Sequence, residues 1–191
     1  MKVPLRYQST RYDCGTASLL NAIGYLYDRE KIPVEFLKTI YNYTLDDFGP
    51  NKLPGSEGTS FEALNLVAHH LNNYAEKTGF KIKAELFSGN DIDERLFKKY
   101  LRPNTVAVVR VWIEPGHYIM VRDICDDKVY AFDPYYVTDD EYDDDSAVEI
   151  VPNEPFKYNR IINRSRFFSH GDGYFPQGKF ENREALFISK G

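Results

Sequence analysis

The segment DCGTASLLNAIGYLYDRE, residues 13–30, combines a short polar start with apolar residues at helical spacing. Apolar side chains recur every three or four positions, and further leucines widen the apolar face: Ala17, Leu19, Leu20, Ile23, Leu26 and Tyr27. This pattern predicts a mostly buried helix from about Gly15 to Tyr27. Cys14 would then lie at the N-terminal end of that helix.

Downstream of this helix the pattern stays helical at first and then changes to that of strands. Residues 46–58 hold three glycines and two prolines, which predicts a loop. Thr59 and Glu62 have the spacing of a capping box and predict a further helix that extends to about Thr78. Residues 80–86 alternate between apolar and charged side chains, which predicts a half-buried strand.

A short helix, three closely spaced strands and a last apolar run follow. We predict these elements at residues 92–101, 105–113, 117–124, 129–133 and 185–189. The last run could close the sheet, the segment Glu114-Pro115-Gly116 predicts a turn, and residues 152–183 show no clear period. Helices followed by an antiparallel sheet indicate the α+β class. We expect residues 1–191 to form a single domain, because we find no linker and no internal repeat.

The composition argues against several classes of protein. Apolar residues make up 42% of the 191 residues and charged residues 28%, as in ordinary globular proteins. The net charge is −5, and residues 123–149 hold eleven Asp or Glu against one Lys, so we expect no nucleic-acid partner. We expect no membrane span, because no apolar run approaches the roughly 18 residues that cross a bilayer. Residues 1–15 lack the apolar core of a signal peptide, so we expect a cytoplasmic location.

Cys14 lies where a cysteine can become reactive. A free thiol has a pKa near 8.5. The unpaired N–H groups and the partial positive charge of a helix N-terminus favour the thiolate, which is the reactive form. The alternative is that Cys14 is a small core residue, as most free cysteines are. The second cysteine, Cys125, is followed by two acidic residues, which raise the pKa of a thiol and make it less reactive.

Three further polar residues would complete a thiol-dependent site. A histidine such as His117 can accept the thiol proton, and a carboxylate such as Asp133 can orient the imidazole. Gln8, six residues before Cys14, can donate to an oxyanion together with the backbone N–H of the cysteine. His117 and Asp133 lie at the same end of a predicted hairpin. Their side chains share a face only if the hairpin contains an odd loop or a bulge, and we expect one.

These residues together resemble the papain-like cysteine peptidases of the bacteriocin-leader type, family C39, and C39-like domains. The family pattern is a glutamine upstream of Asp-Cys-Gly, then His-Tyr far downstream, then Asp-Pro. The resemblance covers roughly residues 5–135. The matching residues of this chain, in order, are Gln8, Asp13-Cys14-Gly15, His117-Tyr118 and Asp133-Pro134, with sixteen positions from His117 to Asp133.

The resemblance implies a papain-like fold, in which a helical half carries Cys14 and an antiparallel sheet carries His117 and Asp133. It implies Cys14 as the nucleophile, His117 as the base, Asp133 as the orienting residue and Gln8 as the oxyanion donor. The activity expected is hydrolysis of a peptide or amide bond through a thioester, with no cofactor and no metal. The substrate would be a peptide or a small amide, and the acidic run 123–149 favours a cationic one.

Two other functions fit the same sequence. An acyltransferase would use the same thioester chemistry and pass the acyl group to an amine instead of water. A catalytically silent relative would keep the groove and bind peptides, and its Cys14 would react no faster than a free thiol.

The remaining histidines and the arginine-rich segment are weaker candidates for chemistry. We expect His69 and His70 to be a partly buried and an exposed helix residue. His170 could be the base of a second site or, with Asp172, a metal ligand, but metal sites need more ligands than these. Three arginines interleaved with aromatic residues are expected to pack or to face solvent rather than bind nucleic acid: Arg160, Arg164 and Arg166.

Overall fold

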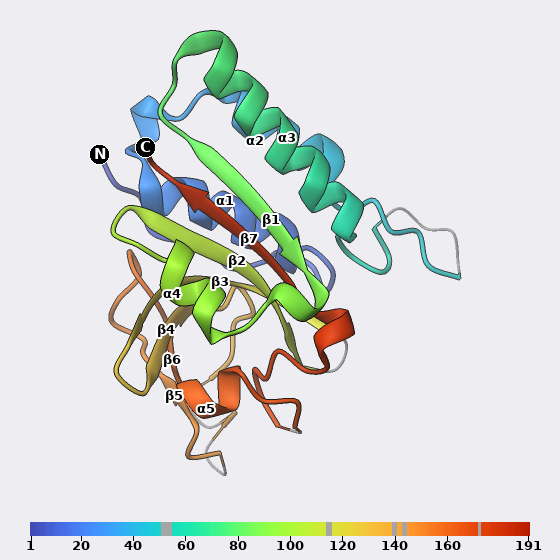
Figure 1. Cartoon of the computed structure of the whole chain (residues 1–191), viewed down its shortest axis with the longest axis vertical. Coiled ribbons are helices and arrows are strands. Elements are labelled where there is room, and N and C mark those ends of the chain that lie inside the picture. The colour runs from blue at the N-terminus through green and yellow to red at the C-terminus, as the bar shows by residue number, and fades with distance from the viewer. Residues whose placement is uncertain (51–54, 114–115, 139–140, 143–144, 172) are drawn as a thin grey trace.

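The computed structural model describes residues 1–50, 55–113, 116–138, 141–142, 145–171 and 173–191, and combines helices with an antiparallel sheet (Figure 1). The helices are α1 (Cys14–Leu26), α2 (Val34–Tyr43), α3 (Phe61–Thr78), α4 (Glu94–Tyr100) and α5 (Arg164–Phe167). The strands are β1 (Lys83–Ser88), β2 (Thr105–Trp112), β3 (Gly116–Cys125), β4 (Lys128–Phe132), β5 (Val148–Ile150), β6 (Arg160–Asn163) and β7 (Glu184–Ser189). The predicted α+β class is therefore confirmed.

The strands form one sheet in the order β1-β7-β2-β3-β4-β6-β5, and all of its neighbours are antiparallel. The predicted strand at residues 185–189 exists, but it lies inside the sheet between β1 and β2 instead of closing it at an edge. Strands β5 and β6 and helix α5 were not predicted. Each is three or four residues long, which is too short for a period to be recognised.

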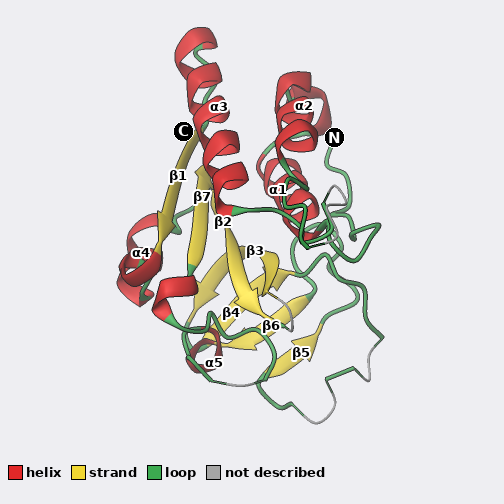
Figure 2. Cartoon of the chain, turned by 90° about the vertical axis from the view of Figure 1, so that its right-hand side faces the viewer, coloured by secondary structure: helices red, strands yellow, loops and turns green. Residues whose placement is uncertain are grey.

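Helices cover both faces of the sheet, but unequally. Figure 2 shows α1, α2 and α3 gathered together, with α4 and α5 apart from them. Along β2, Val106 and Val108 belong to the core shared with α1–α3, while Ala107 and Val109 belong to the core that includes α4 and α5. This alternation follows from the two-residue repeat of a strand. Helix α1 lies against β2 and β3 and is buried on nearly all sides, which places its first residue beside the sheet.

Helix α1 confirms the predicted helix at residues 15–27. The predicted N-cap of α3, Thr59, was wrong by one residue. The N-cap of α3 is Ser60, whose hydroxyl accepts a hydrogen bond from the Ala63 N–H at 3.1 Å. Thr59 is instead buried against Gly15, where a Cβ added to the glycine would lie 2.6 Å from the threonine hydroxyl. Gly15 is therefore needed for the packing of α1 against the residue that precedes the N-cap of α3.

Other predicted boundaries need smaller corrections. Strand β1 begins at Lys83 instead of residue 80, and α4 covers seven of the ten residues predicted as helix. The predicted loop at 46–58 contains no helix or strand in its described part; residues 51–54 lie outside the described residues. The same holds for Glu114 and Pro115 of the predicted turn.

The hairpin of β3 and β4 contains the expected bulge. Val121 pairs with Ala131, but the next pair is Asp123 with Tyr130, so the register shifts at Arg122. Cys125 pairs with Lys128, which leaves a two-residue turn between the strands. Without the extra residue, a slip of one position would put the side chains of one strand on the opposite face. The bulge therefore lets His117 and Asp133 share a face.

No helix within the described residues combines the length and the apolar character that crossing a membrane requires.

Candidate active site

Cys14 is the first residue of α1 and borders two cavities. Its exposed fraction is 7%, so most of the side chain is buried. One cavity, of about 680 Å³, is also lined by Gln8 and His117. The other, of about 430 Å³, is lined by the start of α3 and by side chains from β2, β3 and β7. A substrate that crosses the thiol would therefore reach into both.

Asp13 organises the segment that leads into α1. Its carboxylate does not cap the helix. It accepts hydrogen bonds from the backbone N–H groups of Ser9 and Thr10, at 3.0 and 2.7 Å, and from the Thr10 hydroxyl at 2.8 Å. The backbone N–H of Gln8 donates to the Pro134 carbonyl at 2.8 Å. Residues 8–13 are thus folded back so that Gln8 lines the same cavity as the thiol.

His117 and Asp133 form a buried pair at one end of the β3–β4 hairpin. The Nε2 atom of His117 donates to Oδ1 of Asp133 at 2.7 Å, and the exposed fractions of the two residues are 9% and 0%. The same oxygen accepts from the Tyr135 N–H at 2.8 Å. Asn159 fixes the backbone of Asp133 on both sides, because its amide accepts from the Asp133 N–H and donates to the Asp133 carbonyl. The Nδ1 atom of His117 is left for Cys14.

The pKa values of the thiol and the imidazole shift in opposite directions. Burial favours the neutral thiol of Cys14, but the hydrogen bond and the charge of His117 outweigh it and lower the pKa of Cys14. Burial also disfavours a charged imidazole, but the carboxylate of Asp133, followed by the contact with Cys14, raises the pKa of His117 to about 10. Both shifts favour the ion pair, with the proton on His117 and a thiolate on Cys14.

One amide N–H of Gln8 is available to a group bound in the larger cavity. Its Nε2 donates one hydrogen bond, to the Thr10 carbonyl at 2.8 Å, and an amide nitrogen has a second N–H. Its Oε1 is buried with no hydrogen-bond partner among the described residues. The N–H of Cys14, at the first position of α1, has no acceptor within the helix. These are two donors of the kind that an oxyanion needs.

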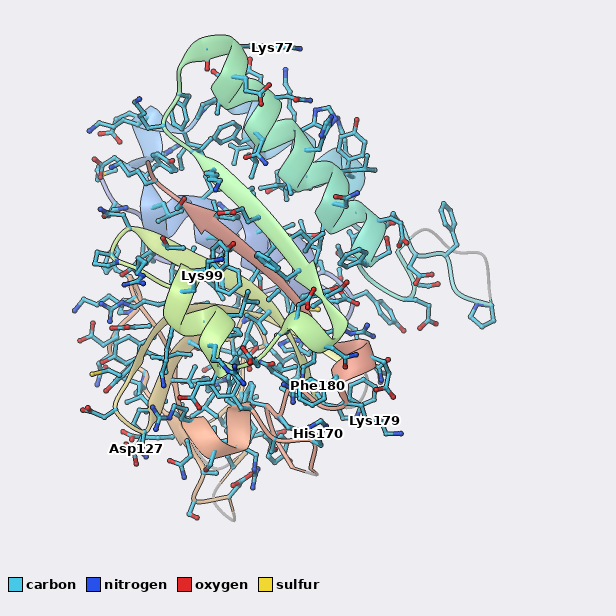
Figure 3. All side chains as sticks on the ribbon, in the orientation of Figure 1. Lys77, Lys99, Asp127, His170, Lys179 and Phe180 are labelled. Carbon is cyan, nitrogen blue, oxygen red and sulfur yellow. The ribbon has the colours of Figure 1, made fainter. Side chains whose placement is uncertain are left out.

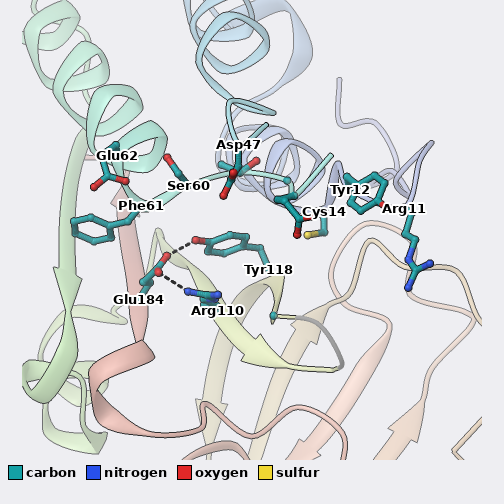
Figure 4. A pocket seen from close by; sticks show the side chains of 14 residues that line it. Arg11, Tyr12, Cys14, Asp47, Ser60, Phe61, Glu62, Arg110, Tyr118 and Glu184 are labelled. Atoms are coloured by element: carbon teal, nitrogen blue, oxygen red, sulfur yellow. Dashed lines mark hydrogen bonds and ion pairs between the residues drawn. The ribbon is translucent and has the colours of Figure 1, made fainter. Parts of the chain in front are cut away.

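The smaller cavity combines a buried polar network with an acidic rim (Figure 4). The Tyr118 hydroxyl donates to Glu184, and Nη1 of Arg110 pairs with the other oxygen of that carboxylate at 2.8 Å. The charge of Glu184 is thereby compensated. Three exposed carboxylates line the same cavity: Asp47, Glu57 and Glu62. The cavity is therefore suited to a cationic group.

The acidic run 123–149 contributes less to the site than its charge indicated. Within the described part of the chain, Glu141 is its only acidic residue that lines either cavity, next to Tyr135 and Tyr136. Asp145 is largely buried and pairs with Arg166 at 2.5 Å. The negative charge beside Cys14 comes instead from the loop before α3 and from the start of that helix. The sequence indicated a loop and a capping box there, but no part of the site.

The other histidines lie away from Cys14. One of the pair is exposed and one half-buried, but in the reverse of the predicted order: His69 is exposed, and His70 is half-buried and stacks on Tyr43 with ring centroids 5.0 Å apart. His170 lies beside Phe180 near α5, with ring centroids 4.6 Å apart (Figure 3). Asp172 lies outside the described residues. Among the residues that are described, no group of three or more His, Cys, Asp or Glu side chains is arranged to hold a metal ion.

One residue next to the site was missed. Arg160 was expected to pack or to face solvent, and it is indeed packed, with an exposed fraction of 2%. Its Nη2 atom lies 3.6 Å from Oδ2 of Asp133. The only sequence signal is a charged residue next to an apolar pair in RIIN, residues 160–163, and four residues are too few to indicate a buried strand.

Comparison with known proteins gives a likeness in fold. No protein-family model matches the chain, and no curated protein matches it. Among solved structures, the chain is similar to the crystal structure of a double-glycine-motif protease from an AMS/PCAT transporter in complex with the leader peptide. The TM-score is 0.50 and the sequence identity 15%, over 100% of this chain and 93% of that one. The chain therefore shares the arrangement of helices and sheet of that protease.

Proposed function

We propose that residues 1–191 form a single C39-like cysteine peptidase domain, a thiol-dependent hydrolase that cleaves a peptide or amide bond. Cys14 is the nucleophile, His117 the base, Asp133 the orienting carboxylate and Gln8 an oxyanion donor. The observation that carries the proposal is that Cys14 and His117 line one cavity with opposite pKa shifts of thiol and imidazole, while the buried Asp133 accepts a hydrogen bond from His117. The likeness in fold to a protease supports it.

The reaction follows from this arrangement. The Cys14 thiolate attacks the carbonyl carbon, and the developing oxyanion accepts hydrogen bonds from the Gln8 amide and the Cys14 N–H. His117 gives its proton to the leaving amine, which departs and leaves a thioester on Cys14. Neutral His117 then takes a proton from water, whose oxygen attacks the thioester. Collapse of the second intermediate releases the carboxylic acid and restores the thiolate with its imidazolium.

The substrate we propose is a peptide, with a cationic group on one side of the scissile bond. The structural neighbour is a protease in complex with a leader peptide, which supports a peptide. Asp47, Glu57 and Glu62 around the smaller cavity support the cationic group. We propose no cofactor, since a thiol, a base and two oxyanion donors suffice for this reaction. We keep the cytoplasm as the expected location.

A mixture of short synthetic peptides of varied sequence tests the proposal. The wild-type chain and Cys125→Ala should produce new carboxyl ends, and Cys14→Ala should produce none, as measured by mass spectrometry. Cys125 is a matched control because it is the other free cysteine. Products that join the acyl group to an added amine would indicate an acyltransferase instead. If Cys14 fails to react with a peptide electrophile, the peptidase proposal is wrong and a silent binding relative is favoured.

A further inference from the structure

Arg160, the first residue of β6, is a buried cation beside Asp133. Its Nη2 lies 3.6 Å from Oδ2 of Asp133 and donates to the Tyr135 carbonyl at 3.2 Å. Its Nη1 donates to the Asn159 carbonyl at 2.8 Å, and its guanidinium lies 5.5 Å from the ring centroid of Tyr142. Around the carboxylate of Asp133, the guanidinium thus contacts Tyr135, Tyr142 and its own neighbour Asn159.

Asp133 needs a compensating charge, because it is completely buried. Its Oδ1 accepts from His117 and from the Tyr135 N–H, whereas its Oδ2 has no hydrogen-bond partner among the described residues. A buried carboxylate without a cation takes up a proton instead of staying charged. While His117 is protonated, the imidazolium compensates Asp133. When His117 has given its proton away, Arg160 is the cation that remains in contact.

We propose that Arg160 is a positioning residue, which holds the Asp133 carboxylate charged and turned toward His117 in both protonation states of the imidazole. The catalytic meaning of this role rests on the proposed function. The inference also assigns a role to β6, which lies beyond the segment that resembles the C39 pattern. Asn159, the residue before Arg160, hydrogen-bonds the backbone of Asp133. Two consecutive residues thus contact Asp133, Asn159 at its backbone and Arg160 at its carboxylate.

Other charged and titratable groups surround the pair and are kept constant in the test. Cys14 faces His117 from α1, and Tyr142 faces Arg160 from the segment after β4. Burial raises the pKa of Tyr142, which keeps its hydroxyl neutral. Tyr135 lies edge-on to the imidazole at 6.5 Å, and Arg11 and Glu141 line the cavity farther out. Replacing Cys14 by Ser removes the thiolate and leaves Asp133 and Arg160 as the main charges that act on His117.

The test is the titration of His117 in a Cys14→Ser background. With ¹³C-labelled histidine only four ring signals need to be assigned by NMR. Removing a buried cation raises the proton affinity of the coupled His117–Asp133 pair, whichever residue holds the proton. Arg160→Met should therefore move the midpoint upward by about one pH unit or more, whereas Arg160→Lys, which keeps the charge, should stay near the parent value.

Arg183→Met is the matched control. Arg183 also has an exposed fraction of 2%, but it donates to the carbonyls of Gly178, Ile92 and Phe168 and forms no ion pair with a carboxylate of the described residues. Its loss should lower the melting temperature without moving the His117 midpoint. A midpoint that Arg160→Met leaves unchanged, or lowers, would overturn the inference. The titration does not depend on catalytic activity. An unreactive Cys14 would therefore refute the peptidase proposal and leave the inference about Arg160 untouched.

A second measurement applies if Arg160→Met does not fold. The double variant Asp133→Asn/Arg160→Met removes both charges and should fold again, because no uncompensated charge remains buried. If the double variant is as unfolded as the single one, Arg160 serves the carbonyls of Tyr135 and Asn159 and not the carboxylate, and the inference is wrong.

Discussion

The two free cysteines offer a direct test of the activated thiol. We expect iodoacetamide at pH 6 to alkylate Cys14 well before Cys125, although Cys14 is buried and Cys125 is exposed. The order of reaction is the reverse of what accessibility alone predicts. It follows from the ionisation of the two thiols, since only the thiolate is the nucleophile.

The expected ratio follows from the surroundings of each sulfur. The charge of Asp126 raises the pKa of Cys125 above 9.0, so at pH 6 fewer than about one Cys125 thiol in a thousand is ionised. The hydrogen bond and the charge of His117 lower the pKa of Cys14 despite its burial, so we expect a larger ionised fraction of Cys14 at that pH. A thiolate of lower pKa is intrinsically a weaker nucleophile, and burial slows access to it. We expect the gain in thiolate to outweigh both effects, so that Cys14 reacts about tenfold or more faster than Cys125.

The assay is timed alkylation followed by tryptic digestion and mass spectrometry. The two cysteines fall in separate peptides, residues 12–29 and 123–128. His117→Ala should slow Cys14 to the rate of Cys125 or below, because the two largest effects that lower the pKa of Cys14 are lost while its burial remains, whereas His170→Ala should change nothing. In denaturant the two cysteines should react at similar rates. Equal rates in the folded chain, or an unchanged Cys14 rate in His117→Ala, would refute the reasoning.

Four further outcomes are expected. Gln8→Ala should lower peptide turnover by roughly a hundredfold while the melting temperature stays within error, since one oxyanion donor is lost; unfolding instead would make Gln8 structural. Asp133→Asn should lower turnover less than loss of the base does, and should reduce the free energy of unfolding by about 3 kcal/mol, because a buried cation loses its partner. Gly15→Ala should destabilise by about 1–3 kcal/mol through its clash with Thr59, whereas Gly24→Ala, which meets no atom within 4 Å, should be neutral or stabilising by chemical denaturation. A preference for cationic peptides should weaken between low and high salt, because exposed charges are screened over about 8 Å at physiological salt; a salt-independent preference contradicts the acidic rim.

The sequence carried enough information to place the central elements of the candidate site. An apolar helix after Asp-Cys-Gly and two strands with a turn between them are long, periodic patterns, and the requirement that His117 and Asp133 share a face was enough to predict a bulge. Where two adjacent residues could each cap a helix, the sequence did not determine which one does. Thr59 and Ser60 are both good capping residues, and only the packing of Gly15 against Thr59 determines that Ser60 caps α3.

Tertiary contacts account for what could not be predicted. Arg160 lies in a strand of four residues that pairs with both β4 and β5, and its buried guanidinium lies 3.6 Å from the carboxylate of Asp133. Likewise, the carboxylates Glu57 and Glu62 belong to a loop and to a helix start. The sequence around Glu57 and Glu62 does not indicate that α1 brings Cys14 to the same cavity.

The position of β7 has a consequence for how the chain is made. Its neighbours β1 and β2 are synthesised long before it, yet they contact each other in the sheet only through it. Until residues 184–189 emerge from the ribosome, both strands have an unpaired edge, and such edges are prone to pair with other chains. Glu184 of the same strand also completes the network under the smaller cavity. A nascent chain would therefore hold Cys14, His117 and Asp133 before the smaller cavity beside Cys14 is complete, and premature termination in this strand should yield aggregates.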